Sequence, residues 1–249
     1  MKFAPAALSL AFLFASQISW GADDYEKRIA EFVKAREQAE KQGPEAVMAV
    51  MEKQSRGLVR DFPDKPDGYI VLLQVAEFGG VEKAKDILKQ IDFSKAPEEV
   101  QSMSKGMQAR LDLIGKPLDL KYKAIDGREV DLAAMKGKVV LLDFWATWCG
   151  PCVASLPDLK AIYEKLHAKG FEVLGISLDE DKTQLEEFLK TKEVPWPQFF
   201  DGQGWQGAFP QKFKITLIPT VWLVNKKGVL VDIAAHDSLA KKVEALLAE

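Results

Sequence analysis

The sequence predicts an all-helical N-terminal region followed by an α/β domain whose sheet is flanked by helices. Residues 22–112 place apolar side chains at helical spacing, with short breaks between the runs. Residues 113–249 instead alternate strand-like apolar runs with amphipathic helices, as expected of an α/β sheet. The chain has 249 residues, 47% of them hydrophobic and 29% charged, which suits a soluble globular protein of one or two domains.

Residues 1–21 have the pattern of a secretory signal peptide. Lys2 supplies a positive start, an apolar run extends from Phe3 to Ala15, and Ser19 and Gly21 place small residues before a cleavage site at Ala22. The run is shorter than a membrane span, and no cysteine near the cut offers a lipid anchor. We expect a protein exported to a compartment such as the bacterial periplasm and soluble after cleavage. The alternative is a buried core helix.

Residues 22–112 are expected to form about five short amphipathic helices. Breaks are predicted at Gly43-Pro44, at Pro63 to Pro66 and at Gly79-Gly80, and Pro44 suits the first turn of a new helix. Residues 61–84 partly resemble a tetratricopeptide-type helical hairpin, a unit whose stacks offer protein-binding surfaces. The alternative, which we favour, is a helical cap that packs on its neighbour.

The α/β domain is expected over residues 113–249. Asp126-Gly127 and Lys227-Gly228 are turn dipeptides between strands. The run Val139 to Phe144 is almost wholly apolar, as in a strand of a sheet covered on both faces. The predicted strands are 118–124, 139–144, 171–177, 220–224 and 229–233. Three helices are predicted: one that begins at Cys149, one over residues 181–190, and one that begins at residue 239 and ends the chain.

The chemistry is expected at Cys149-Gly150-Pro151-Cys152, directly after the strand that ends near Trp145. This spacing places Cys149 at the start of a helix, where unpaired backbone N–H groups favour a thiolate, and Cys152 one turn later. We therefore expect Cys149 to be the exposed nucleophile and Cys152, more buried, to resolve the mixed disulfide. Half a zinc site and a passive disulfide are the alternatives.

Two further residues fit this chemistry. Asp143, inside the apolar strand, is expected to have a raised pKa and to act as the base for Cys152; a strand-end Asp bonded to backbone or to a lysine is the alternative. Pro219 follows Ile218 directly before a strand. Taken alone, the Ile218-Pro219 sequence favours a trans peptide bond, because cis bonds are rare even before proline. In the context of the C-x-x-C motif we expect a cis bond instead.

Composition limits other functions. Lys and Arg number 34 against 37 for Asp and Glu, so a nucleic-acid partner is not expected. The chain has two cysteines and two histidines, His167 and His236, which lie far apart in sequence. We expect no metal site and no cofactor.

The combined motifs resemble the thioredoxin-like family, and most closely its exported branch typified by the TlpA and ResA proteins. The resemblance is carried by Phe144 to Cys152 (Phe-Trp-Ala-Thr-Trp-Cys-Gly-Pro-Cys), Leu156-Pro157, Gly175 to Asp179, Ile218-Pro219-Thr220 and Asn225 to Gly228. It implies a cis Pro219 beside Cys149 and an extra helix and strand within residues 180–201. It also implies that a bound partner chain contacts Trp148, Gly150, Pro151, Pro219 and the backbone of Ile218.

Two departures bear on the direction of electron flow. Ser155 stands where many members of the exported branch have Glu, which weakens transfer of a cytochrome c maturation role. Asp143 and the Gly150-Pro151 pair look like thioredoxin itself, and both favour a reductant.

Aromatic side chains near the motif have two interpretations. The resemblance makes Trp148 an exposed rim beside Cys149, whereas Trp145 and Trp222 are expected in the core. Core packing is also favoured over a partner-binding surface for the inserted cluster of Trp196, Phe199, Phe200 and Trp205.

The leading functional hypothesis is an exported thiol–disulfide oxidoreductase that reduces disulfides of exported partner proteins. A membrane thiol reductant is expected to recycle it, and the oligomeric state is left open. One alternative is a thiol peroxidase, although Ala146 occupies the position three before Cys149 where related peroxidases have Thr, and Thr147 lies two before. The other is a binding module in which residues 22–112 recruit a partner and the thiols are secondary.

Overall fold

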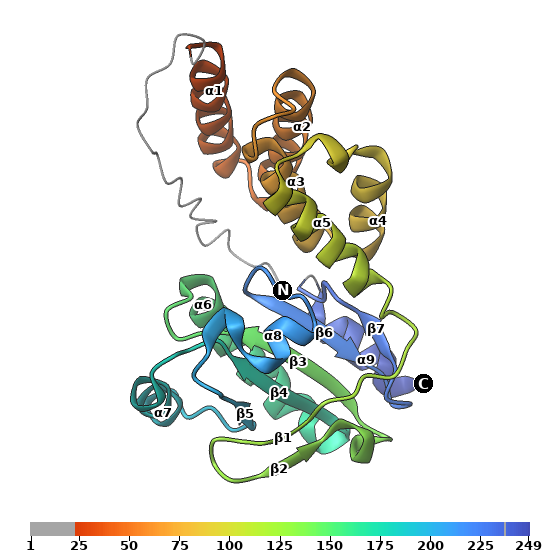
Figure 1. Cartoon of the computed structure of the whole chain (residues 1–249). Coiled ribbons are helices and arrows are strands. Elements are labelled where there is room, and N and C mark those ends of the chain that lie inside the picture. The colour runs from red at the N-terminus through yellow and green to blue at the C-terminus, as the bar shows by residue number, and fades with distance from the viewer. Residues whose placement is uncertain (1–22, 237) are drawn as a thin grey trace. The chain divides into compact units, whose positions relative to one another are not determined.

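The computed structural model describes residues 23–236 and 238–249 (Figure 1). The predicted signal peptide lies outside the described residues. The chain divides into two compact units, one ending at Lys105 and the other spanning Gly106–Glu249. The division falls inside the helix Glu98–Leu111 (α5), and the boundary predicted at residues 112–113 stays a prediction.

Five helices follow one another from residue 23 to residue 111, as predicted. Gly43, with a φ of 108°, and Gly80, with a φ of 87°, precede two of them in a backbone conformation that favours glycine. Pro44 occupies the first turn of its helix, which confirms the expectation for that residue. The helices are α1 (Asp23–Glu40), α2 (Pro44–Asp61), α3 (Asp67–Phe78), α4 (Val81–Gln90) and α5 (Glu98–Leu111).

The third helix is the most buried of the N-terminal unit. Helices α2 and α4 both pack against α3, and α1 packs against α2. Burial on two sides explains why α3 has a largely apolar sequence rather than a single apolar face. Its buried apolar residues are Tyr69, Val71, Leu72, Leu73, Val75 and Ala76.

The C-terminal unit is built on a mixed five-stranded sheet in the order β5-β4-β3-β6-β7 (Figure 1). Strands β3, β4 and β5 are mutually parallel. Strand β6 pairs antiparallel with β3, and β7 pairs antiparallel with β6. Flanking helices complete the predicted α/β class, and the fold is thioredoxin-like. The strands are β3 (Val139–Trp145), β4 (Phe171–Ser177), β5 (Gln198–Phe199), β6 (Thr220–Val224) and β7 (Leu230–Asp232). The helices are α6 (Gly150–Leu166), α7 (Lys182–Thr191), α8 (Ala208–Lys212) and α9 (Leu239–Ala248).

Both faces of the sheet are covered, as the apolar run of β3 predicts. On one face, Val139 and Leu141 of β3 are buried with Leu156 of α6 and Val243 of α9. On the other, the ring of Phe213, directly after α8, packs against Phe144 and Trp222 with centroids 6.2 Å and 5.3 Å apart. Alternation along β3 directs odd-numbered side chains toward α6 and even-numbered ones away from it.

A separate hairpin joins β1 (Lys121–Lys123) to β2 (Glu129–Asp131). Gly127, with a φ of 89°, lies in the predicted turn. The predicted strand 118–124 is longer than β1. Just before it, Gly115 and Lys116 exchange backbone hydrogen bonds with Leu230 of β7.

The segment between β4 and Pro219 contains α7 and β5, which confirms the extra helix and strand that the resemblance implies. Asp181 caps α7 by accepting hydrogen bonds from the backbone N–H groups of Thr183 and Gln184. The sequence did not predict α8, because five residues that include Pro210 are too short to form a periodic pattern.

Candidate active site

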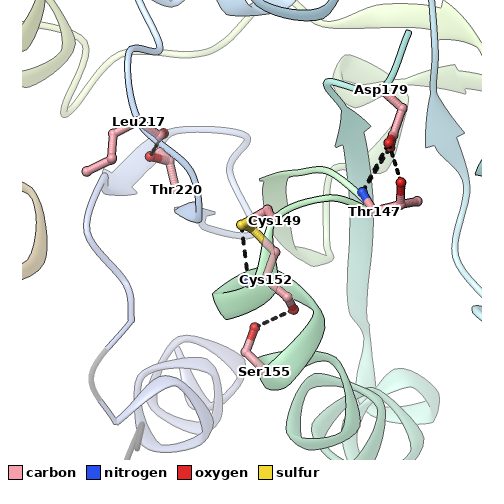
Figure 2. Close-up of a disulfide and its surroundings, with 7 residues drawn as sticks. All are labelled: Thr147, Cys149, Cys152, Ser155, Asp179, Leu217 and Thr220. Carbon is pink, nitrogen blue, oxygen red and sulfur yellow. Dashed lines mark hydrogen bonds between the residues drawn. A yellow bond between two sulfur atoms is a disulfide. The ribbon is translucent and has the colours of Figure 1, made fainter. Parts of the chain in front are cut away.

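The cysteine motif begins α6, where β3 leads out of the sheet. Cys149 has extended backbone angles (φ −83°, ψ 96°) and occupies the N-cap position. Its Sγ accepts a hydrogen bond from the backbone N–H of Cys152 over 3.3 Å (Figure 2). Gly150 and Pro151 form the first helical positions, where the missing N–H of a proline is tolerated. The sulfur of Cys149 therefore lies at the positive end of the helix dipole.

Cys149 and Cys152 form a disulfide with an S–S distance of 2.03 Å. We expected Cys149 to be exposed and Cys152 more buried, yet their exposed fractions are 6% and 5%. In the oxidised form that expectation is therefore wrong, since each sulfur covers the other once the bond is made. The two cysteines differ in their position in α6, where Cys149 is the N-cap and Cys152 lies within the first turn, and not in their exposure.

Asp143 lies on the α6 face of the sheet. Because side chains alternate along β3, Asp143 points to the same face as Val139 and Leu141. Both of these residues belong to the core shared with α6. Its side chain keeps a small accessible surface, yet the surrounding protein raises the pKa of the carboxyl to about 7 by burial. Within the described residues this carboxyl makes no hydrogen bond or ion pair, so no partner offsets the loss of water. The alternative of a structural Asp bonded to backbone or lysine has no contact to support it.

The Ile218–Pro219 peptide bond is cis, as the C-x-x-C context and the family resemblance led us to expect. The bond precedes β6, whose first residue, Thr220, is opposite Phe144 of β3. The end of β3 and the start of β6 therefore lie at the same edge of the sheet, which brings this loop to the region of the cysteines. Thr220 Oγ1 donates a hydrogen bond to the carbonyl of Leu217 over 2.7 Å, across the cis bond (Figure 2). Ile218 and Pro219 are half-buried.

Trp148 is the large apolar side chain with the greatest exposure in the described chain, at 58%. Trp205, in the short 3-10 turn Gly204–Gln206, lies beside it with ring centroids 6.3 Å apart. Trp145 and Trp222 are buried, as expected of core residues. The inserted aromatic cluster is thus divided, because Trp196 is 2% exposed in the core whereas Trp205 joins the rim.

Asp179 is a site residue whose role no sequence pattern predicted. Its carboxylate accepts the backbone N–H of Thr147, at 3.1 Å to each oxygen, and the Thr147 hydroxyl at 2.5 Å (Figure 2). Ser177 donates a further hydrogen bond to it over 2.8 Å. The available signal was a charged residue closing the apolar run of β4.

Gln198 was also missed. Its Oε1 accepts the indole N–H of Trp145 over 2.8 Å, and its side chain crosses β4 at Gly175. A Cβ at Gly175 would lie 1.9 Å from Gln198 Oε1, so the glycine makes room for this contact. The sequence carried no sign of it, since the two strands are paired only in the folded sheet.

Ser155, the departure from the exported branch, makes a local contact. Its hydroxyl donates to the carbonyl of Cys152 over 2.9 Å (Figure 2). It therefore brings no charge to the motif.

In residues 23–236 and 238–249, no group of three or more His, Cys, Asp or Glu side chains is arranged to hold a metal ion. No helix in these ranges combines the length and the apolar character that crossing a membrane requires.

The thioredoxin-like sheet, with its C-x-x-C disulfide at the start of α6, defines the class of thiol–disulfide oxidoreductases. The family model described as Redoxin matches residues 95–247, which is more than half of the chain. The chain belongs to the Redoxin family.

Curated relatives carry names of the same class. The thiol-disulfide oxidoreductase ResA of Bacillus cereus is 29% identical over 124 residues, which make up 49% of this chain and 69% of ResA. The thioredoxin-like protein YneN of Bacillus subtilis is 30% identical over 132 residues, 52% of this chain and 75% of YneN. A crystal structure from Chlorobium tepidum, described as a putative thiol:disulfide interchange protein DsbE, is 31% identical, covers 55% of this chain and 98% of that one, and has a TM-score of 0.48.

Proposed function

We propose that the protein is an exported reductant of disulfides in partner proteins, acting through Cys149 and Cys152. The observation that carries the proposal is the placement of Cys149 at the N-cap of α6, with Asp143 buried on the sheet face that α6 covers. This arrangement favours a thiolate on one cysteine and supplies a base for the other.

The reaction transfers two electrons to the partner. The Cys149 thiolate attacks one sulfur of the partner disulfide, the partner S–S bond breaks, and a mixed disulfide forms while the other partner sulfur leaves as a thiolate. Cys152 then attacks Cys149 Sγ, which releases the second partner thiol and leaves the Cys149–Cys152 disulfide. Reduction of that disulfide by an external dithiol, proposed to belong to a membrane thiol reductant, completes the cycle.

Asp143 is proposed to accept the proton of the Cys152 thiol as this thiol becomes the attacking group. A carboxyl whose pKa is about 7 exchanges protons readily near neutral pH. An ordinary Asp, ionised well below pH 7, is a much weaker base.

The partner is proposed to bind as an extended segment across Cys149. Trp148 offers exposed apolar surface on one side, and the backbone of Ile218 beside Pro219 offers groups to pair with on the other. Gly150 carries no side chain and Pro151 is half-buried, so the helix start stays accessible to a polypeptide backbone.

Disulfide reduction and trapping test the proposal together. The reduced wild type should cleave insulin disulfides, and Cys149→Ser should abolish the reaction. Cys152→Ser should accumulate mixed disulfides with exported proteins, and the double variant Cys149→Ser/Cys152→Ser should trap none. Absence of insulin reduction by a folded, reduced wild type would contradict the proposal.

Export is tested separately. N-terminal sequencing of the protein recovered from its native compartment should give Ala22 as the first residue. Recovery of an intact Met1 from the cytoplasm would contradict this part.

The two alternatives remain measurable outcomes. A thiol peroxidase would consume hydrogen peroxide in a Cys149-dependent reaction. Against it, the Thr147 hydroxyl already donates a hydrogen bond to Asp179. A binding module would keep its cellular function in Cys149→Ser. Either result would replace the proposed function.

A further inference from the structure

A buried carboxylate, Asp179, fastens the segment that leads into the cysteine motif. It lies just beyond β4 and is 3% exposed. Three donor groups surround it: the backbone N–H and the hydroxyl of Thr147, and the hydroxyl of Ser177. Thr147 stands two residues before Cys149, so the carboxylate binds the loop between β3 and α6 directly (Figure 2).

The same loop is fixed by two backbone hydrogen bonds. Leu178 N–H donates to the Trp145 carbonyl over 2.8 Å, and Cys149 N–H donates to the Ala146 carbonyl over 3.1 Å. Hydrogen bonds therefore join the loop to the end of β4 at two residues, Trp145 and Thr147. Only the interaction of Thr147 with Asp179 involves side chains, so only this interaction can be altered by substitution.

Asp179 has no ion pair in the part of the chain that the structure describes. A buried charge without a counter-ion is unfavourable unless hydrogen bonds replace its water, and apolar side chains would hold two strands together at least as well. What the carboxylate adds is a fixed position for the donors that it accepts. Two of its three donor groups belong to Thr147.

We propose that Asp179 is a positioning residue for the redox reaction, holding Thr147 so that Cys149 stays at the N-cap of α6. The inference rests on the thiol–disulfide chemistry of Cys149 proposed above. With the loop fixed, Cys149 Sγ receives the Cys152 N–H at 3.3 Å and benefits from the helix start. With the loop released, the sulfur spends part of its time away from these groups, and the thiolate loses stabilisation.

Thr147→Val isolates this contact because it removes the hydroxyl without changing charge. The measurement is the rate of iodoacetamide alkylation of Cys149 in the reduced full-length protein, followed by peptide mapping from pH 5 to pH 10. We expect the midpoint to move upward and the rate at pH 7 to fall about fivefold. Thr147→Ser, which keeps the hydroxyl, should restore the wild-type profile.

Asp179→Asn separates positioning from charge. If Asp179 acted only through its negative charge, its neutralisation would favour the thiolate, speed alkylation and leave Thr147→Val without effect; that result would overturn the proposal. Positioning requires Thr147→Val to slow alkylation whatever the effect of Asp179→Asn, because asparagine keeps one oxygen that can accept the Thr147 donors. Glu180→Gln and Thr191→Val are matched controls, because both side chains are exposed and neither should move the profile.

A structural role alone is also distinguishable. If Thr147→Val lowers the melting temperature but leaves the pH profile unchanged, the contact only stabilises the fold and the proposal fails. If Thr147→Val does not fold, Ser177→Ala is measured instead, because it removes a single donor from Asp179 and should shift the profile in the same direction by less. If the wild type fails to reduce insulin but its alkylation profile depends on Thr147, the proposed function is contradicted, whereas the positioning of Cys149 by Asp179 is supported.

Discussion

At the residue scale, the proposed chemistry depends on two groups with opposite surroundings. Cys149 lies at a helix start, where N–H groups and the helix dipole stabilise negative charge. Asp143 lies against the core, where burial raises the pKa of its carboxyl to about 7 and so favours the neutral form. The surroundings of Cys149 thus favour its thiolate, and those of Asp143 allow its carboxyl to exchange a proton near neutral pH.

We predict that the Cys149 thiol in the reduced protein has a pKa below the ordinary value of about 8.5 and reacts before Cys152. The reason is the N-cap position of Cys149, because the two cysteines do not differ in exposure in the oxidised form. Brief alkylation at neutral pH followed by peptide mapping measures it. Preferential labelling of Cys152 would reverse the assignment of the nucleophile.

We predict that Asp143→Asn slows release of the reduced partner about tenfold at pH 7, with a smaller effect on the first attack. Only the second step requires a base for Cys152. Release by the wild type should also accelerate as the pH rises through about 7 and Asp143 ionises, whereas release by the variant should lack this inflection and follow only the ionisation of the Cys152 thiol. Stopped-flow measurement of the two steps tests this, and equal slowing of both would show that Asp143 is structural.

The same residue predicts a pH dependence of stability. The pKa of Asp143 is raised on folding, so its destabilising effect is absent below about pH 4, grows as only the unfolded chain ionises, and is complete above about pH 7. Asp143→Asn should therefore stabilise the oxidised protein at pH 8 by at most about 4 kcal/mol, since the carboxyl keeps some accessible surface. Urea unfolding at pH 4 and pH 8 measures it, and an equal effect at both values would contradict the assigned pKa.

At the element scale, the register of β3, β4 and β5 joins three residues that are distant in sequence. Gly175 lies between Asp143 of β3 and Gln198 of β5 in the paired strands. Gln198 reaches across this glycine to the indole N–H of Trp145. The absence of a side chain at one position thus permits a buried hydrogen bond next to the loop that leads to Cys149.

We predict that Gly175→Ala displaces the Gln198 side chain and leaves the buried indole N–H of Trp145 without its acceptor, at a cost of about 1–3 kcal/mol plus strain. Gln198→Ala should cost less in the Gly175→Ala background than in the wild type, because the clash is relieved. A double-mutant cycle by urea unfolding measures the coupling. Strictly additive effects would show that the two side chains do not interact.

At the scale of the whole molecule, the C-terminal unit contains every group assigned to the reaction. It begins at Gly106, so the last part of α5 belongs to it. Arg110, a buried residue of that helix, donates a hydrogen bond to the carbonyl of Lys214. The helical N-terminal unit contributes neither cysteine nor histidine.

We predict that the fragment Leu113–Glu249 folds alone and keeps dithiol activity on insulin. A fragment that begins at Gly106 should be more stable by about 1.5–3 kcal/mol, because it keeps the charged hydrogen bond of Arg110. Thermal melting and the insulin assay on both fragments test this. If neither fragment folds, the two units depend on one another for stability.

Trapping then tests whether residues 22–112 select partners or only cover a neighbour. If they select partners, the fragment Leu113–Glu249 with Cys152→Ser should trap fewer proteins than the full-length chain with Cys152→Ser. This comparison requires that the fragment and the full-length chain, both with Cys152 intact, reduce insulin at equal rates. An unchanged set of trapped proteins would favour the helical cap.

The sequence by itself determined the five N-terminal helices, the strands β1, β3, β4, β6 and β7 with the helices α6, α7 and α9, and the place of Cys149 and Cys152 at a strand-to-helix junction. These features are local: periodicity, turn dipeptides and the spacing of the motif lie within short stretches of chain. The burial of Asp143 was also predictable, because it interrupts an apolar strand. Tertiary structure alone decided that Asp179 binds Thr147, that Gln198 bonds Trp145 over Gly175, and that Trp205 joins Trp148 while Trp196 enters the core. Each of these contacts depends on which strands become neighbours and in what register, and residues so far apart in the chain carry no local pattern that fixes this.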